Sequence, residues 1–486
     1  MVLVRDSGEI ESAKDSTTSY PFIDAEGHRF ALPSVYPSVS METHDRPQTI
    51  LPNKLADLSC ASFTPATLLA QMNAFFESNF PLTPGVETCL TEFIDDACDL
   101  GQMYGYLRPW VPYMSDAREL SAFPASMRGR REKDLKLRST AINSDRIVNP
   151  HVPARRIWDL LANRVLPYHA ISPDNNDEVW LAKSIWAVSH SWVAPSERHS
   201  VLTPINGMAW RVPIPCGTTL EDIRNELLSL GAQYVFLDVL CLRQEDELLP
   251  EKESIRKREW RLDIPTIGYM YDNTWSVPRT IVVYFNGLGL PFLGDQANAN
   301  DQFHWFNRVW TLQESPKGTV IVGGLKGLKK SKLSLHEASD WPSTGIDDNF
   351  LRLLRTAETV KSLAASNHMS NAIQLARSRY CARPVDRVAC LAYILGCPTL
   401  PIYDADIDVE VAWSLLVECL PDEKRLELLF SDFGSRAQPT SWRPTWKQVN
   451  SCPRLRSPGF FDEDERLTLL DGSSPDLKYR YGFDAY

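Results

Sequence analysis

The stretch QYVFLDVLCL, residues 233–242, decides the fold class of this chain. Its apolar residues run on without alternation and include β-branched and aromatic side chains, which is typical of a strand buried on both faces of a sheet. Gly231 precedes the run and the polar segment RQEDE follows it, so the strand is bounded on both sides. Two shorter runs have the same character, IWAV at 185–188 and RTIVVYF at 279–285. We therefore expect at least three buried strands.

Helical patterns lie between and around these strands. We expect helices over 219–230, over 257–270 and across FNRVWTLQE (306–314), and another in ARRIWDLLANRVL (154–166), where apolar residues recur at helical spacing. Strands that alternate with helices predict an α/β fold with a small, mostly parallel sheet. In such sheets, ligands bind at the carboxyl ends of the strands.

The rest of the chain divides into further regions, because one hydrophobic core stops growing at roughly 250 to 300 residues. The N-terminal segment is rich in Ser, Thr, Pro and Asp, which predicts a poorly ordered lead-in. Amphipathic helices follow it, and helical patterns such as NFLRLLRTAETVKSLAAS, SNAIQLARSRY and DVEVAWSLLVECL fill the end of the chain. We expect a lead-in over 1–60, a helical region over 61–150, an α/β domain over 151–325 and a mainly helical region over 326–486.

Composition excludes several classes of function. The formal net charge of the 486 residues is -11, which disfavours nucleic acid as a partner. The one basic run, 128–138, is interrupted by acidic residues and predicts a solvated helix face. Ten scattered cysteines without a C-x-x-C pair indicate a reducing compartment and no metal site. No window is apolar enough for a membrane span, and the N-terminus lacks a secretory signal, so we expect a cytoplasmic protein.

Three segments resemble a known family. They are IWAVSHSWV (185–193), YVFLDVLCLRQ (234–244) and FNRVWTLQE (306–314). In order and spacing they are similar to the three hallmark blocks of the fungal heterokaryon incompatibility (HET) domain, which read A-L-S-Y/H-x-W, Y-x-W-I-D-x-L-C-I-x-Q and R-x-W-T-L-Q-E. Two positions depart from this pattern: Val193 stands where the family commonly has Gly, and Phe236 where it has Trp.

The resemblance implies a function. HET domain proteins act in self/non-self recognition and programmed cell death, a form of innate immunity. The HET domain has a distant likeness to Toll/interleukin receptor-type (TIR) domains, many of which cleave NAD with a glutamate in a W-x-x-x-E pattern. This likeness implies a TIR-like (flavodoxin-like) sheet, with Glu314 as the catalytic residue and NAD as substrate, without a required cofactor. It also implies homo-oligomers and other incompatibility proteins as partners.

Two carboxylates carry the predicted chemistry. An unpaired Asp238 inside an apolar strand would cost several kcal/mol, so it reaches the strand end or finds partners. It either binds a ligand hydroxyl or forms an ion pair with Arg308 or Arg243. A helical 306–314 segment would place Glu314 on one face with Trp310, where it is catalytic or pairs with a buried arginine.

The turn after the first strand supplies the predicted ligand contacts. Loops at strand ends commonly bind ligands, so we expect a nucleotide-type small molecule to bind there and at the third segment. The expected binding residues are Ser189, His190, Trp192, Arg308 and Trp310. A non-catalytic signalling module, whose motif residues are structural, remains the alternative. A hydrolase with Cys241 as nucleophile is a third possibility, although a thiol in the run VLCL is more often inert packing.

Overall fold

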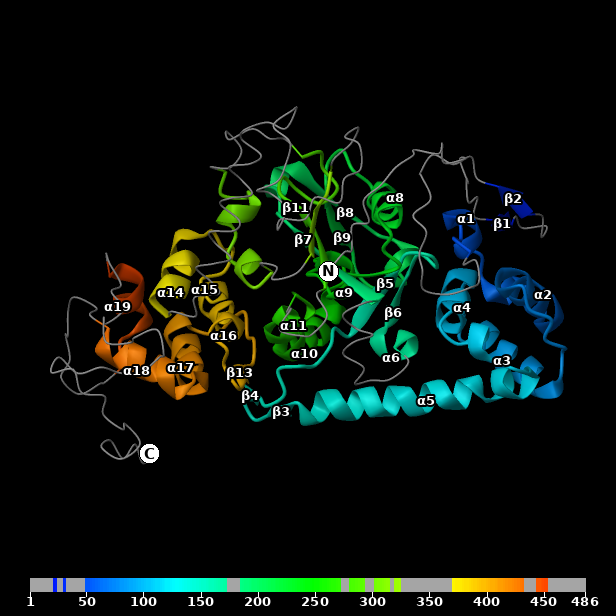
Figure 1. Cartoon of the computed structure of the whole chain (residues 1–486), viewed down its shortest axis with the longest axis horizontal. Helices are drawn as coiled ribbons and strands as arrows, with labels where there is room; N and C mark the ends of the chain where they lie inside the picture. Colours follow the sequence, from blue (N-terminus) through cyan, green and yellow to red (C-terminus); the bar gives the residue numbers. More distant parts are fainter. Residues whose placement is uncertain are drawn as a thin grey trace, which may run out of the picture.

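The computed structural model describes residues 21–23, 29–31, 49–172, 184–271, 279–292, 301–314, 319–324, 369–431 and 443–452. Three regions follow one another along the long axis of the molecule: N-terminal helices, a central sheet with its helices, and C-terminal helices (Figure 1). Each region has its own cluster of buried apolar side chains. The division into several cores agrees with the length of the chain.

A six-stranded mixed sheet forms the centre, with the strand order β12-β11-β7-β10-β5-β6. Its strands are β5 (Arg156–Asp159), β6 (Arg164–Pro167), β7 (Ile185–His190), β10 (Tyr234–Leu237), β11 (Thr280–Tyr284) and β12 (Thr319–Val322). Strands β12, β11, β7 and β10 are parallel, whereas β5 is antiparallel to both β10 and β6. Together with the helices, this sheet confirms an α/β architecture with a mixed sheet.

The three apolar runs form the middle of the sheet. All four residues of β10 are buried, and it pairs with β7 through Leu237 and Val188. On its other side β7 pairs with β11, where Tyr284 lies opposite His190. Because these strands are parallel and in register, their carboxyl ends meet at one edge. A small antiparallel pair, β8 (Arg198–Val201) and β9 (Val212–Pro215), follows β7 in the chain.

The helix expected over 154–166 is wrong, because the segment forms the β5–β6 hairpin. Turn chemistry explains the difference. The Asp159 carboxylate accepts hydrogen bonds from the backbone N–H groups of Leu161 and Ala162, at 2.9 and 3.1 Å. Asn163 takes a left-handed φ of 52° and accepts a bond from the Trp158 indole. These side chains close a turn in the middle of the apparent helical stripe.

Other helices accompany the sheet. They are α6 (Tyr168–Ile171), α8 (Leu220–Leu230), α9 (Asp238–Cys241), α10 (Glu253–Asp263) and α11 (Gly268–Tyr271). The prediction over 219–230 is confirmed: the Thr219 side chain caps α8, and Gly231 ends it with a φ of 103°. The single helix expected over 257–270 is instead two helices, α10 and α11, separated by a 3-10 turn that starts at Pro265.

The N-terminal region is helical, as expected. It contains α1 (Asn53–Ala56), α2 (Pro65–Phe76), α3 (Pro84–Asp95), α4 (Leu100–Leu107) and α5 (Ala117–Thr140). Before it, β1 (Pro21–Ile23) and β2 (Arg29–Ala31) pair antiparallel. Most of the expected lead-in over 1–60 lies outside the described residues, and its boundary stays a prediction. Within 49–60, Leu51, Leu55 and Cys60 are buried in the core of the N-terminal helices.

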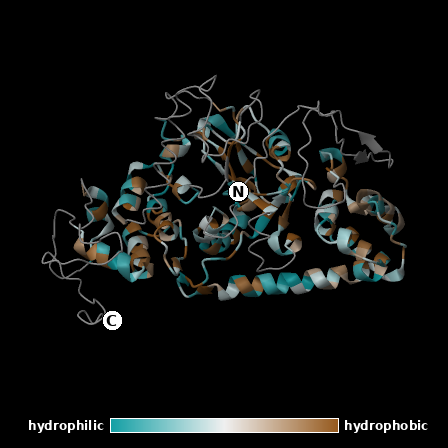
Figure 2. Cartoon of the chain, viewed as in Figure 1, coloured by the Kyte–Doolittle hydropathy of each residue, from teal (hydrophilic) through white to brown (hydrophobic). Residues whose placement is uncertain are grey.

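Helix α5 extends along one side of the molecule, from the N-terminal helices to the C-terminal region (Figure 1). Figure 2 shows long hydrophilic stretches on it, and the basic run lies there. Arg131 and Lys133 are exposed, as a solvated face requires. Arg138 differs, since it is buried and pairs with Asp134 at 2.9 Å.

The C-terminal region is mainly helical within the described residues. Its helices are α14 (Met369–Ser378), α15 (Asp386–Ala389), α16 (Leu391–Ile394), α17 (Val409–Cys419), α18 (Asp422–Phe430) and α19 (Trp446–Ser451). The helix expected in NFLRLLRTAETVKSLAAS lies outside the described residues. A small sheet joins this region to the end of α5, with β13 (Leu400–Pro401) pairing with β4 (Arg146–Ile147), which pairs with β3 (Ile142–Asn143).

Candidate functional site

The candidate site lies at the carboxyl edge of the central sheet. His190 is the last residue of β7, and Asp238 follows the last residue of β10 as the first residue of α9. The sheet register pairs the ends of these two strands, which brings the two side chains together. Asp238 therefore does not remain inside an apolar strand; it both reaches the strand end and finds partners.

The buried His190 forms an ion pair with the half-buried Asp238, with 2.7 Å between Nε2 and Oδ1. Burial disfavours both charged forms, but the mutual attraction outweighs it, so the pKa of His190 is raised and that of Asp238 is lowered. The second ring nitrogen of His190 lies 3.0 Å from the Ser191 carbonyl oxygen. Because both nitrogens face acceptors, this environment favours the imidazolium form.

The remaining oxygen of the Asp238 carboxylate accepts from the Trp192 indole N–H at 3.4 Å, and the backbone N–H of Val239 donates to the first at 2.7 Å. The expected ion pair of Asp238 with Arg308 or Arg243 is not its closest interaction. Arg243 instead faces Glu259 at 3.5 Å. The His190 ion pair and these hydrogen bonds hold the Asp238 side chain in position at the start of α9.

Glu314 lies beside this pair and is 8% exposed. Its carboxylate accepts a hydrogen bond from the Ser189 hydroxyl at 2.5 Å, and the Trp305 indole N–H donates to that same hydroxyl at 2.6 Å. Burial, and then the charge of Asp238, raise the pKa of Glu314 to about 7, against weaker opposing effects of Ser189, His190 and Arg308. Glu314 can thus gain or lose a proton near neutral pH.

The helix expected across 306–314 is wrong. The segment forms two 3-10 turns, Trp305–Asn307 and Trp310–Leu312, with an extended Arg308 between them. Tyr380 is the reason, because it bonds to the backbone on either side of Arg308: its N–H donates to Asn307 at 2.5 Å and its carbonyl accepts from Val309 at 3.0 Å. A helix cannot continue through a residue held in this bridge.

A cavity of about 730 Å³ opens onto these residues. Six of the seven residues expected at the site line it, namely His190, Trp192, Asp238, Arg308, Trp310 and Glu314. Ser189 is fully buried and holds Glu314. The structure therefore brings the three motif segments together, and the volume lies in the range of small-molecule sites.

Other residues that line the cavity were not predicted from the sequence. The C-terminal region contributes Tyr380, Arg383, Asp386 and Tyr403. Arg198, the first residue of β8, and Arg211, the residue before β9, also line the cavity. Tyr380, Arg383 and Asp386 all lie in the segment ARSRYCARPVDR, 376–387. Nothing in its spacing indicates that Tyr380 would bridge to Arg308.

Cys241 does not have the environment of a nucleophile. It is fully buried, burial raises its pKa to about 12, and its sulfur contacts the backbone of Leu237 and Val235 at 3.5 and 3.7 Å. His190, on the neighbouring strand β7, is paired with Asp238 and not with this thiol. These contacts favour inert packing over a thiolate.

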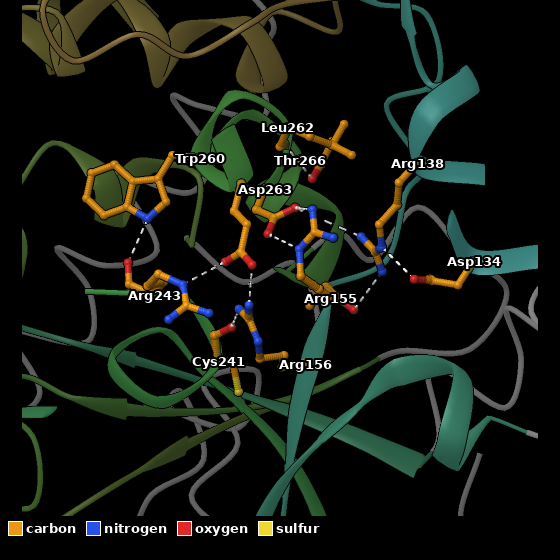
Figure 3. A network of polar contacts seen from close by, with 12 residues as sticks. Asp134, Arg138, Arg155, Arg156, Cys241, Arg243, Trp260, Leu262, Asp263 and Thr266 are labelled. Carbon is orange, nitrogen blue, oxygen red and sulfur yellow. Dashed lines mark hydrogen bonds and ion pairs between the residues drawn. The ribbon is translucent and has the colours of Figure 1, made fainter. Parts of the chain in front are cut away.

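A second charged network surrounds the end of α9 (Figure 3). Arg155 pairs with Asp263 at 2.9 Å, and Arg156 pairs with Glu259 at 2.5 Å while donating to the Cys241 carbonyl oxygen at 3.3 Å. Because Cys241 ends α9, the network connects the helix that begins at Asp238 with α10 and β5. The charges here are paired, so this network is structural.

Among the described residues, no group of three or more His, Cys, Asp or Glu could hold a metal ion. Within the same part of the chain, no helix combines the length and apolarity that a membrane span needs. Searches against protein-family models, curated protein sequences and solved structures returned no significant match to the chain.

Proposed function

We propose that this protein is a HET-type effector of self/non-self recognition and programmed cell death, and that its TIR-like α/β domain cleaves NAD with Glu314 as the catalytic residue. The observation that carries the proposal is the convergence of the three motif segments on one cavity beside a buried glutamate whose pKa is raised to about 7. Perturbed carboxylates in a concave site are typical of catalytic centres.

The proposed reaction hydrolyses the bond between nicotinamide and ribose. As this bond breaks, its electron pair stays on the nicotinamide nitrogen, which leaves as a neutral molecule, and the ribose carbon becomes oxocarbenium-like. An ionised Glu314 would stabilise that positive charge. Water then bonds to the ribose carbon and releases a proton, which the Glu314 carboxylate can accept. Asp238, held by His190, would accept hydrogen bonds from ribose hydroxyls.

Purified full-length protein tests the proposal. Incubation with NAD should release nicotinamide, and Glu314→Gln should abolish the release while the far-UV circular dichroism spectrum stays unchanged. Glu251→Gln, an exposed position on a 3-10 turn, is the matched control and should retain activity. Nicotinamide release that persists in Glu314→Gln would remove the catalytic role from this residue.

One observation favours a second function, that of a non-catalytic signalling module. Ser189 and Trp305 hold the Glu314 carboxylate in a chain of short hydrogen bonds, which would also suit a residue that only stabilises the fold. In that case wild-type protein would release no nicotinamide, and cell killing would be unchanged in any Glu314 variant that folds. Measuring cell death and NAD content together separates the two functions.

A further inference from the structure

Two arginines lie against the indole of Trp192 at the candidate site. The guanidinium carbons of Arg198 and Arg308 are 5.0 and 5.8 Å from the ring centroid, which is within cation–π range. Arg198 begins β8, whereas Arg308 lies in the bridge to Tyr380. Both line the cavity, so two separate segments converge to place positive charge beside one aromatic ring.

These two arginines differ from other arginines that line the cavity, because no carboxylate in the described part of the chain contacts them. Arg211 and Arg383 have carboxylate partners, Asp246 at 3.5 Å and Glu245 at 3.0 Å. Among the residues that the structure describes, neither Arg198 nor Arg308 is within ion-pair distance of a carboxylate. Burial is the main reason that the pKa of each is lowered. Carboxylates act on Arg308 only from beyond ion-pair distance, so its burial is compensated only in part. A partly buried cation that no carboxylate contacts is costly for the fold, and an anionic ligand would offset that cost.

Charge is distributed unevenly around the cavity. Arg198 and Arg308 lie against Trp192, whereas the Glu314 carboxylate is held by Ser189 near the end of β7 and Asp238 follows the end of β10. Arg308 is the nearer of the two arginines to these carboxylates, whose charges act on it. A ligand with an anionic group and a cationic ring would match both zones. Guanidinium groups bind phosphate oxygens through paired hydrogen bonds, which gives them a geometric preference for phosphates.

We propose that Arg198 and Arg308 form a subsite for the pyrophosphate of a nucleotide, which directs the cationic nicotinamide end of NAD toward Glu314 and Asp238. The identity of the substrate rests on the function proposed above, whereas the phosphate subsite does not. Trp192 would serve mainly to position the two guanidinium groups, because they and the stacked His190 ring already contact its indole.

Isothermal titration of the full-length protein with ADP, inorganic pyrophosphate and adenosine tests the subsite. ADP and pyrophosphate should bind, and adenosine should bind at least roughly tenfold more weakly than ADP. Arg198→Gln and Arg308→Gln should each weaken ADP binding roughly tenfold without affecting adenosine. Arg118→Gln removes the same charge at an exposed position on α5 and should leave ADP binding unchanged.

Three results would overturn the subsite: equal binding of ADP and adenosine, no binding of pyrophosphate or ADP, or unchanged ADP binding in both folded glutamine variants. If a glutamine variant fails to fold, Arg198→Lys and Arg308→Lys retain the charge but not the paired hydrogen bonds, and intermediate ADP affinity is expected.

Phosphate-dependent ADP binding without nicotinamide release would support the subsite and contradict the proposed hydrolase. If nicotinamide release depends on Glu314 but ADP binding does not depend on Arg198 or Arg308, the hydrolase is supported and the phosphate subsite is contradicted.

Discussion

At the scale of single residues, Glu314 connects the candidate site to the stability of the fold. Burial and the nearby Asp238 raise its pKa from an ordinary 4.5 to about 7. Below pH 4.5 both the folded and the unfolded chain hold the proton, so the favourable contribution of the neutral acid is fully present. As the pH rises toward 7 the unfolded chain releases its proton first, and this contribution is lost.

We therefore expect Glu314→Gln, which cannot ionise, to change the pH dependence of stability. Between about pH 4.5 and 7 the wild type should lose on the order of 3 kcal/mol of unfolding free energy relative to the variant. Urea denaturation at a series of pH values measures the difference. The exposed control Glu251→Gln should run parallel to the wild type. Parallel curves for wild type and Glu314→Gln would contradict the raised pKa.

At the scale of elements, the β5–β6 hairpin depends on one acidic side chain. Asp159 is fully buried; one oxygen accepts from two turn N–H groups, and the other pairs with Arg108 at 3.0 Å. Asp159→Ala should destabilise the protein by roughly 3 to 5 kcal/mol, because it leaves a buried arginine charge without its partner. Asp159→Asn keeps an acceptor for the turn and should cost less. A loss below about 1 kcal/mol in Asp159→Ala, by denaturant unfolding, would show that the pair is unimportant.

The elements also show where sequence reasoning succeeds and where it fails. The three apolar runs predicted their strands, because burial on both faces leaves a local signal in the sequence. The stripe over 154–166 predicted a helix, since spacing does not report that Asp159 and Asn163 will close a turn. The helix predicted over 306–314 is wrong because of a contact with a distant part of the chain. Its extended Arg308 depends on Tyr380, about 70 residues further along the chain.

The same limit applies to the candidate site. Parallel strands meet at their carboxyl ends, so the motif residues His190 and Asp238 could be expected to lie together. The hydrogen bond from Ser189 to Glu314, and the one from Trp305 to Ser189, could not be predicted, because hydrogen-bond partners depend on tertiary packing. The C-terminal wall of the cavity gave no recognisable signal.

At the scale of the whole molecule, the network in Figure 3 joins α5, β5 and α10. Asp263 faces Arg155 at 2.9 Å and Arg138 of α5 at 3.9 Å. Asp263→Asn should therefore accelerate amide hydrogen exchange in the last turns of α5, in β5 and in α10 together, because it leaves two arginines with a weaker acceptor. Hydrogen-exchange mass spectrometry measures this.

The matched control for this prediction is Lys257→Gln, which removes the exposed pair with Asp406 on the same helix, α10. Exposed pairs contribute little to stability, so its exchange pattern should match the wild type. Acceleration confined to α10 in Asp263→Asn would contradict the view that the network couples the regions.

The cavity wall has a consequence for synthesis of the protein. Part of its lining comes from described residues between His190 and Glu314, and a second part comes from Tyr380, Arg383, Asp386 and Tyr403. During translation the second part emerges from the ribosome only after the first is complete. A nascent or prematurely terminated chain that ends before Tyr380 lacks this part of the cavity lining, whatever the state of its central sheet.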